Sequence, residues 1–142
     1  MRAEDALLHY RQQALEFASP GEILVKLLDA VVQSCNEART HILRQNPAAK
    51  GLSIGRAIAI LGELEATLRH EVAPDLTARL ASLYQFARDR LLSASIHMDV
   101  TGVDEALKAI QPIRDAYAHV VRQMEQRADV QPAPAGFKAK LE

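Results

Sequence analysis

Two residues in the last third of the chain could act together on a phosphate ester. Arg114 is followed by His119, with four residues between them. An imidazole can give or take a proton near neutral pH, and a guanidinium can hold phosphate oxygens through paired hydrogen bonds. The pair could therefore cleave RNA, provided that the surrounding elements bring both side chains to one substrate.

Other residues that could hold a metal or react as a nucleophile are few. Glu37 with His41 and Asp115 with His119 stand four residues apart, which is the usual spacing of surface ion pairs on helices. A di-iron bundle needs Glu-x-x-His on two helices, and no Glu here is followed by His at that spacing. We expect no metal and no other cofactor. Cys35 is the single cysteine and falls in an apolar stripe, so it is expected to be a small core residue.

The composition indicates a cytoplasmic helical protein. The 142 residues suit one domain, and 49% hydrophobic with only 4% aromatic residues favours packed helices over a sheet. Lys and Arg number 17 against 18 for Asp and Glu, so the basic excess of a nucleic-acid-binding protein is missing. The start, MRAEDALLHYR, does not resemble a signal peptide, and no run approaches the ~20 apolar residues of a membrane span. These observations argue against nucleic acid and membrane insertion.

A firm helix start stands at Ser19, whose hydroxyl can cap a helix that begins at Pro20. Glu22 completes the pattern of a capping box. The helix is expected to stop before Pro47, because the residue before a proline is pushed out of helical geometry. Between these limits an apolar stripe at helical spacing predicts a face that packs on partner helices: Leu24, Leu28, Val31, Cys35, Ala38 and Ile42.

Three further helices are expected, each marked by a cap and an apolar stripe. After a loop at residues 48–53 (AAKGLS), the second helix carries Ile54, Ile58, Leu61, Leu64 and Leu68. Asp75 is expected to cap the third, which carries Leu76, Leu80, Leu83, Ala87, Leu91 and Ala94. Thr101 with Asp104 resembles another capping box before the fourth, which carries Val103, Ala106, Ile110, Ile113, Tyr117, Val120 and Met124. Pro112 lies inside this last helix and is expected to kink it.

Four long helices with short connections predict an all-α fold, an antiparallel up-down four-helix bundle. Residues 19–127 form this bundle domain, and residues 128–142 are expected to be a flexible tail. Residues 1–18 form a shorter helical segment with Leu7, Tyr10, Ala14 and Phe17 along one side. Such a short helix is marginal alone in water, so we expect it to dock as a cap on the bundle.

Several short motifs stand in a characteristic order: Tyr10, Leu15 and residues 18–23 (ASPGEI); residues 27–30 (LLDA); Leu80, Leu83-Tyr84, Phe86, Arg90-Leu91 and Ala94; and residues 113–117 (IRDAY). In order and spacing they resemble the FliS family of flagellar export chaperones over about residues 9 to 125. The chain departs from the family pattern at four positions. Phe17 replaces the usual Thr, Leu28 a Tyr, Ala30 a Gly and Tyr117 a Trp.

The resemblance implies a cytosolic bacterial chaperone rather than an enzyme. Such a chaperone binds the disordered C-terminal region of flagellin, prevents premature polymerisation and delivers it to an export gate component of the flagellar type III apparatus. The client is expected to lay amphipathic helices into grooves of the bundle, and the N-terminal segment to cover part of that surface beforehand. Ser19 and Pro20 would then be the hinge of the cap. The sequence leaves a homodimer open.

The residues expected to form the partner-binding or cap surface follow from these motifs and from apolar positions beyond the core stripes. Tyr84 and Phe86 cannot both face the core, because residues two apart point about 200° apart on a helix. The predicted set is Leu7, Tyr10, Leu15, Phe17, Ser19, Pro20, Val25, Val32, Tyr84, Phe86 and Leu91.

Two alternatives stay open at this point. The Arg114-x4-His119 pair resembles the R-x4-6-H signature of HEPN-type ribonucleases, which are also helical bundles. The chain could also be a generic helical scaffold that binds some other partner helix.

Overall fold

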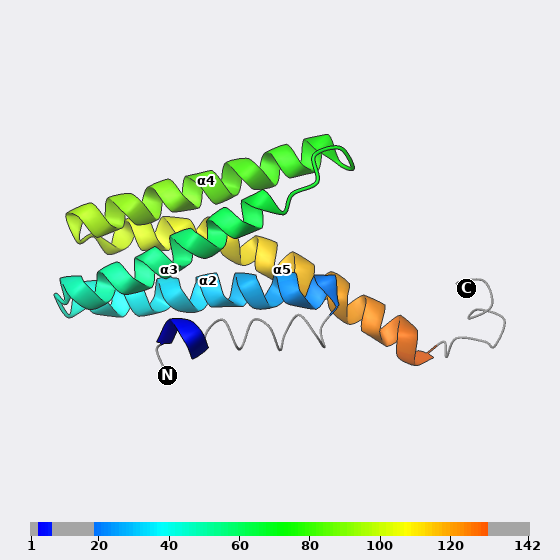
Figure 1. The fold of residues 1–142 in the computed structure, drawn as a ribbon, viewed down its shortest axis with the longest axis horizontal. Coiled ribbons are helices and arrows are strands. Elements are labelled where there is room, and N and C mark those ends of the chain that lie inside the picture. Colours follow the sequence, from blue (N-terminus) through cyan, green and yellow to red (C-terminus); the bar gives the residue numbers. More distant parts are fainter. Residues whose placement is uncertain (1–2, 7–18, 131–142) are drawn as a thin grey trace.

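The computed structural model describes residues 3–6 and 19–130; the remaining residues, 1–2, 7–18 and 131–142, lie outside that part. One helical turn at residues 3–6 precedes four long helices, and the described residues include no strand. The long helices are α2 (Pro20–Leu43), α3 (Pro47–Ala66), α4 (Pro74–His97) and α5 (Val100–Val130) (Figure 1).

Consecutive helices run antiparallel because their connections are short (Figure 1). α2 and α4 each pack against both α3 and α5, which is the square arrangement of an up-down bundle. Leu, Ile, Val and Ala side chains from all four helices fill the interior, with Cys35 and Tyr84 among them. The predicted all-α antiparallel bundle is therefore confirmed.

The first two helices begin where proline follows a capping residue. The hydroxyl of Ser19 accepts a hydrogen bond from the Glu22 amide at 3.2 Å, as the sequence predicts. Asn46 does the same for α3 by accepting from the Ala49 amide at 3.3 Å. The expected loop at residues 48–53 is wrong, because Asn46 and Pro47 start α3 directly and these residues form its first turns.

Two other expected caps are also wrong. Asp75 lies in the first turn of α4, whose N-cap is Ala73 with no side-chain hydrogen bond. Thr101 and Asp104 do not form the expected capping box, because α5 already begins at Val100 and the Asp99 carboxylate accepts a hydrogen bond from the Thr101 amide at 2.9 Å. Asp104 pairs instead with Arg39 of α2 at 3.0 Å, so its role is to join two helices.

The apolar stripes of α4 and α5 differ in part from expectation. On α4, Tyr84 is buried with 1% exposure, whereas Leu76 and Leu83 lie outside the core. Both registers fit helical spacing, and the structure takes the one that buries the larger aromatic ring. On α5, Val120 and Met124 are exposed, whereas Ala118 is buried and Val121 lies against Gly21 at the start of α2.

α5 continues through Pro112 to Val130 without a break, so the first residues of the predicted tail are helical. The kink expected at Pro112 stays a prediction. Near its start the helix lies very close to α4: a Cβ on Gly102 would fall 2.4 Å from the carbonyl oxygen of Arg90 and 2.9 Å from the Cβ of Ala94. This glycine therefore fixes the spacing of the two helices.

Candidate functional site

The N-terminal turn lies in a groove between α2 and α3, which we call the α2–α3 groove. Its volume is about 860 Å³, and small side chains on both helices make it deep. Its lining consists of Lys26, Asp29, Ala30, Gln33, Ser34, Leu52, Arg56 and Ala59, with Ala3, Glu4 and Ala6 of the turn. The turn thus forms one wall of the groove, and the groove itself is open.

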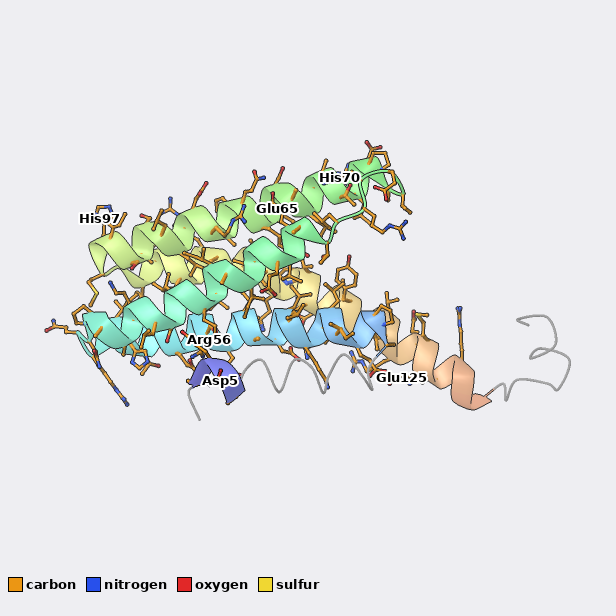
Figure 2. The ribbon with its side chains drawn as sticks, in the orientation of Figure 1. Asp5, Arg56, Glu65, His70, His97 and Glu125 are labelled. Carbon is orange, nitrogen blue, oxygen red and sulfur yellow. The ribbon has the colours of Figure 1, made fainter. Side chains whose placement is uncertain are left out.

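The α2–α3 groove offers both charged and apolar side chains to a bound polypeptide. Figure 2 shows Asp5 on the N-terminal turn and Arg56 on α3, and Glu4 of the turn lines the same groove as Lys26 and Arg56. The groove is therefore lined by an acidic residue of the turn and by two cations of the bundle. Leu52 at the rim is 75% exposed, so the groove also presents apolar surface that the described part of the turn does not cover.

A second groove, the α2–α5 groove, lies on the other flank of α2. Its volume is about 380 Å³, and a ring of charged side chains surrounds a small apolar patch. The lining comprises Val25, Ala118 and Val121 with Glu22, Lys26, Asp29, Arg114, Arg122 and Glu125. Lys26 and Asp29 line both grooves, so this edge of α2 is a ridge between them.

An ion pair joins the two walls of the α2–α5 groove. The guanidinium Nε of Arg114 donates to the Asp29 carboxylate at 2.6 Å, and its Nη1 lies 3.3 Å from the carboxylate of Asp115. The hydrogen bond to Asp29, followed by that to Asp115, raises the pKa of Arg114 above its ordinary value. Arg114 is thereby fixed as a structural cation between α5 and α2.

A third depression, the end cleft, opens at the end of the bundle where α3 connects to α4. Its volume is about 280 Å³, and all four helices contribute to it. It is lined by Leu24, Leu64, Thr67, Leu68, Arg69, Val72, Ala73, Leu76, Thr77, Leu80, Tyr84 and Tyr117. Burial, with a smaller effect from Tyr117, raises the pKa of Tyr84 to about 12, so the Tyr84 phenol stays neutral near pH 7.

The structure separates the predicted surface residues into three groups. Val25 lines the α2–α5 groove, Phe86 is 45% exposed on α4, and Val32 is half-buried against the core. Ser19 and Pro20 are exposed at the start of α2. Tyr84 and Leu91 are buried, at 1% and 0%, so their prediction as partner-binding surface is wrong. Leu7, Tyr10, Leu15 and Phe17 lie outside the described residues.

The prediction failed for Tyr84 and Leu91 because these residues of the family motif lie on the face of α4 that packs into the core. For the pair Tyr84 and Phe86, the expectation that one faces inward and the other outward is confirmed. The sequence reasoning missed Ala30, Ser34 and Ala59, which give the α2–α3 groove its depth. Their small size is the signal that the sequence offers for them.

The residues considered for catalysis do not form a site. Arg114 is held by two carboxylates, and His119, five residues further on, points about 140° away around α5 and is exposed. Glu37 pairs with Arg56 of α3 at 3.4 Å. Cys35 is fully buried, which raises its pKa to about 12. Within residues 3–6 and 19–130, no three His, Cys, Asp or Glu side chains gather as a metal site would require.

A helical bundle whose surface depressions are grooves between helices, lined by apolar and charged side chains, has the features of a protein that binds other polypeptides. The family model described as flagellar protein FliS matches residues 3–124. The chain therefore belongs to the FliS family, which is a family of flagellar secretion chaperones and not of enzymes. The ribonuclease alternative is thereby set aside.

Three relatives illustrate the likeness, each described as a flagellar secretion chaperone. The Escherichia coli K12 protein is 31% identical over 107 residues, covering 75% of this chain and 79% of the relative. The protein from Pseudomonas aeruginosa PAO1 is 27% identical over 121 residues, covering 82% and 96%. That from Bacillus subtilis 168 is 24% identical over 122 residues, covering 86% and 90%.

Across the described residues, none of the helices combines the length and the apolar character that crossing a membrane requires.

Proposed function

We propose that this protein is a cytosolic chaperone for flagellin that binds its disordered C-terminal region, prevents premature polymerisation and delivers it to the export gate of the flagellar type III apparatus. Membership of the FliS family supports an export client. The observation that carries the finer proposal is the open α2–α3 groove, one wall of which is a helical turn of the chain itself.

The groove suits an amphipathic client helix. Its small side chains, Ala30, Ser34 and Ala59, let a helix approach closely, and Leu52 offers apolar surface at the rim. Lys26 and Arg56 can pair with acidic residues on the polar edge of such a helix, as Glu4 lies near them now. A client without stable structure must bury extensive surface to offset the entropy lost on ordering, so the α2–α5 groove is proposed to extend the contact.

The N-terminal segment, residues 1–18, is proposed to act as a cap that the client displaces. Residues 3–6 lie near the middle of α2, and the chain must return to Ser19 at the start of that helix. The cap would carry Leu7, Tyr10, Leu15 and Phe17 along the ridge of α2. Ser19 and Pro20 then serve as the hinge, because their hydrogen bond and fixed φ hold α2 while the cap leaves.

Calorimetry with a peptide from the C-terminal region of flagellin tests the proposal. We expect binding with a strongly negative heat-capacity change, since apolar surface is buried. Ala59→Arg, which places a bulky cation in the groove, is expected to weaken binding at least tenfold, which corresponds to about 1.4 kcal/mol. Ala66→Arg, on an exposed position at the end of the same helix and outside the groove, is the matched control.

The outcomes are distinguishable. Failure of the wild-type chain to bind at micromolar concentration would remove flagellin as the client. If Ala59→Arg left the affinity unchanged, flagellin would remain the client, but its binding site would lie outside the α2–α3 groove.

A further inference from the structure

The end cleft is separate from the surface occupied by the N-terminal turn. That turn lies between α2 and α3 near the middle of the bundle, whereas the end cleft lies where α3 connects to α4. The cleft opens from the core outward: Tyr84 and Leu80 form its buried floor, and Val72 and Leu76 form a rim that is 67% and 55% exposed. It is therefore an apolar depression that leads into the core.

The hydroxyl groups in the wall of the cleft already have partners. The hydroxyl of Thr67 donates to the Leu64 carbonyl oxygen at 2.8 Å, and that of Thr77 donates to the carbonyl oxygen of Ala73 at 2.9 Å. The walls therefore offer apolar surface and two tyrosine rings, Tyr84 and Tyr117, which suits one large apolar side chain, best an aromatic one.

The chain itself supplies such a side chain within reach. α5 leads away from Tyr117 and ends at Val130, about 20 Å further on at 1.5 Å per residue. Phe137, the one aromatic residue that follows Tyr117 in the sequence, comes seven residues after Val130. An extended chain of that length spans about 23 Å, which is just enough to return to the level of Tyr117.

The sequence after α5 also suits a return. Pro132 and Pro134 cannot continue a helix, so the chain can leave the path of α5 soon after Val130. The short covalent connection gives Phe137 a high effective concentration at the cleft, which a separate partner lacks.

We propose that the end cleft binds the side chain of Phe137, which follows α5 in the same chain. The proposal does not depend on which client the α2–α3 groove binds. A client residue or a second copy of the chain in the same cleft are the competing occupants.

Fluorine NMR of the full chain labelled with 3-fluorotyrosine tests this directly. The chain has three tyrosines, of which Tyr84 and Tyr117 line the cleft, so two of three signals report on it. We expect Phe137→Ala to shift the Tyr84 or the Tyr117 signal, and the shift to be the same after tenfold dilution. Leu141→Ala, which removes the other large apolar residue of the same segment, is the control and is expected to leave both signals in place.

Three results would overturn the proposal. Unchanged Tyr84 and Tyr117 signals in Phe137→Ala would show that Phe137 does not enter the cleft. Equal shifts from Leu141→Ala would assign the contact to another residue. A shift that disappears on dilution would show that the occupant comes from a second copy.

Discussion

Replacing Gly102 by Ala is expected to destabilise the bundle, although Ala is the better helix former. The added methyl group would lie 2.4 Å from the Arg90 carbonyl oxygen and 2.9 Å from the Cβ of Ala94. The carbonyl oxygen belongs to the backbone of α4 and cannot rotate away, so α4 and α5 must move apart. Overpacking of this kind costs about 1–3 kcal/mol of unfolding free energy.

Gly55 provides the matched control on α3. A Cβ there would meet nothing within 4 Å, so Gly55→Ala carries only the gain in helix propensity, about 0.5–1 kcal/mol. Gly102→Ala has the same gain in helix propensity, which partly offsets the cost of its clash. Because both variants have this gain, it largely cancels in the difference between their unfolding free energies. We therefore expect Gly55→Ala to be more stable than Gly102→Ala by about 1–3 kcal/mol.

Urea unfolding followed by circular dichroism at 222 nm measures both variants against the wild type. The expected result is a higher midpoint for Gly55→Ala and a lower midpoint for Gly102→Ala, with unchanged slopes. If Gly102→Ala were as stable as Gly55→Ala, the close approach of α4 and α5 would be refuted.

Three other predictions concern single side chains. Lys50 is 8% exposed, and its ammonium donates to the Ser95 carbonyl oxygen at 2.8 Å. Lys50→Met is therefore expected to lower the unfolding free energy, measured by urea unfolding, by about 1–2 kcal/mol. An unchanged unfolding free energy would contradict the role of this hydrogen bond. Cys35 is fully buried with its pKa raised to about 12, so a thiol reagent at pH 8 is expected to react only after unfolding; rapid reaction of the native chain would contradict its burial. Hydrogen bonds from Thr101 lower the pKa of Asp99 below its ordinary 3.8, so its stabilising effect is complete above that value and is lost as the pH falls through the lower folded pKa. The difference in urea midpoint between the wild type and Asp99→Ala is therefore expected to shrink from pH 6 to pH 2. A constant difference would count against the hydrogen bond between the Thr101 amide and the Asp99 carboxylate.

Local sequence rules predicted most of the fold. The stripe from Leu28 to Ile42 in α2 is the clearest case, because a helix in the middle of a bundle must bury residues at a regular spacing. The rules failed where two signals compete. Glycine and serine at residues 48–53 indicated a loop, yet Asn46 and Pro47 supply a helix start that overrides them.

The candidate site was harder to predict from the sequence than the fold. The α2–α3 groove is lined by Ala30 and Ala59 from two separate helices, and the pair of Arg114 with Asp29 joins residues 85 positions apart in the sequence. A single sequence does not specify such register between helices. Tyr84 shows the same limit, since two apolar registers were available on α4 and only packing against α3 and α5 selects one.

The central claim is that the client and the N-terminal segment compete for the α2–α3 groove. The most direct measurement is the affinity of one labelled flagellin C-terminal peptide for the full chain and for a chain lacking residues 1–17, which keeps the Ser19 cap of α2. If the segment competes, only the fraction of molecules with an open groove can bind the peptide, and removing the segment is expected to make all of them competent. For a cap that is open a tenth of the time, the dissociation constant is then expected to fall about tenfold. Weaker binding by the shortened chain would contradict the claim, because it would make the segment part of the client site.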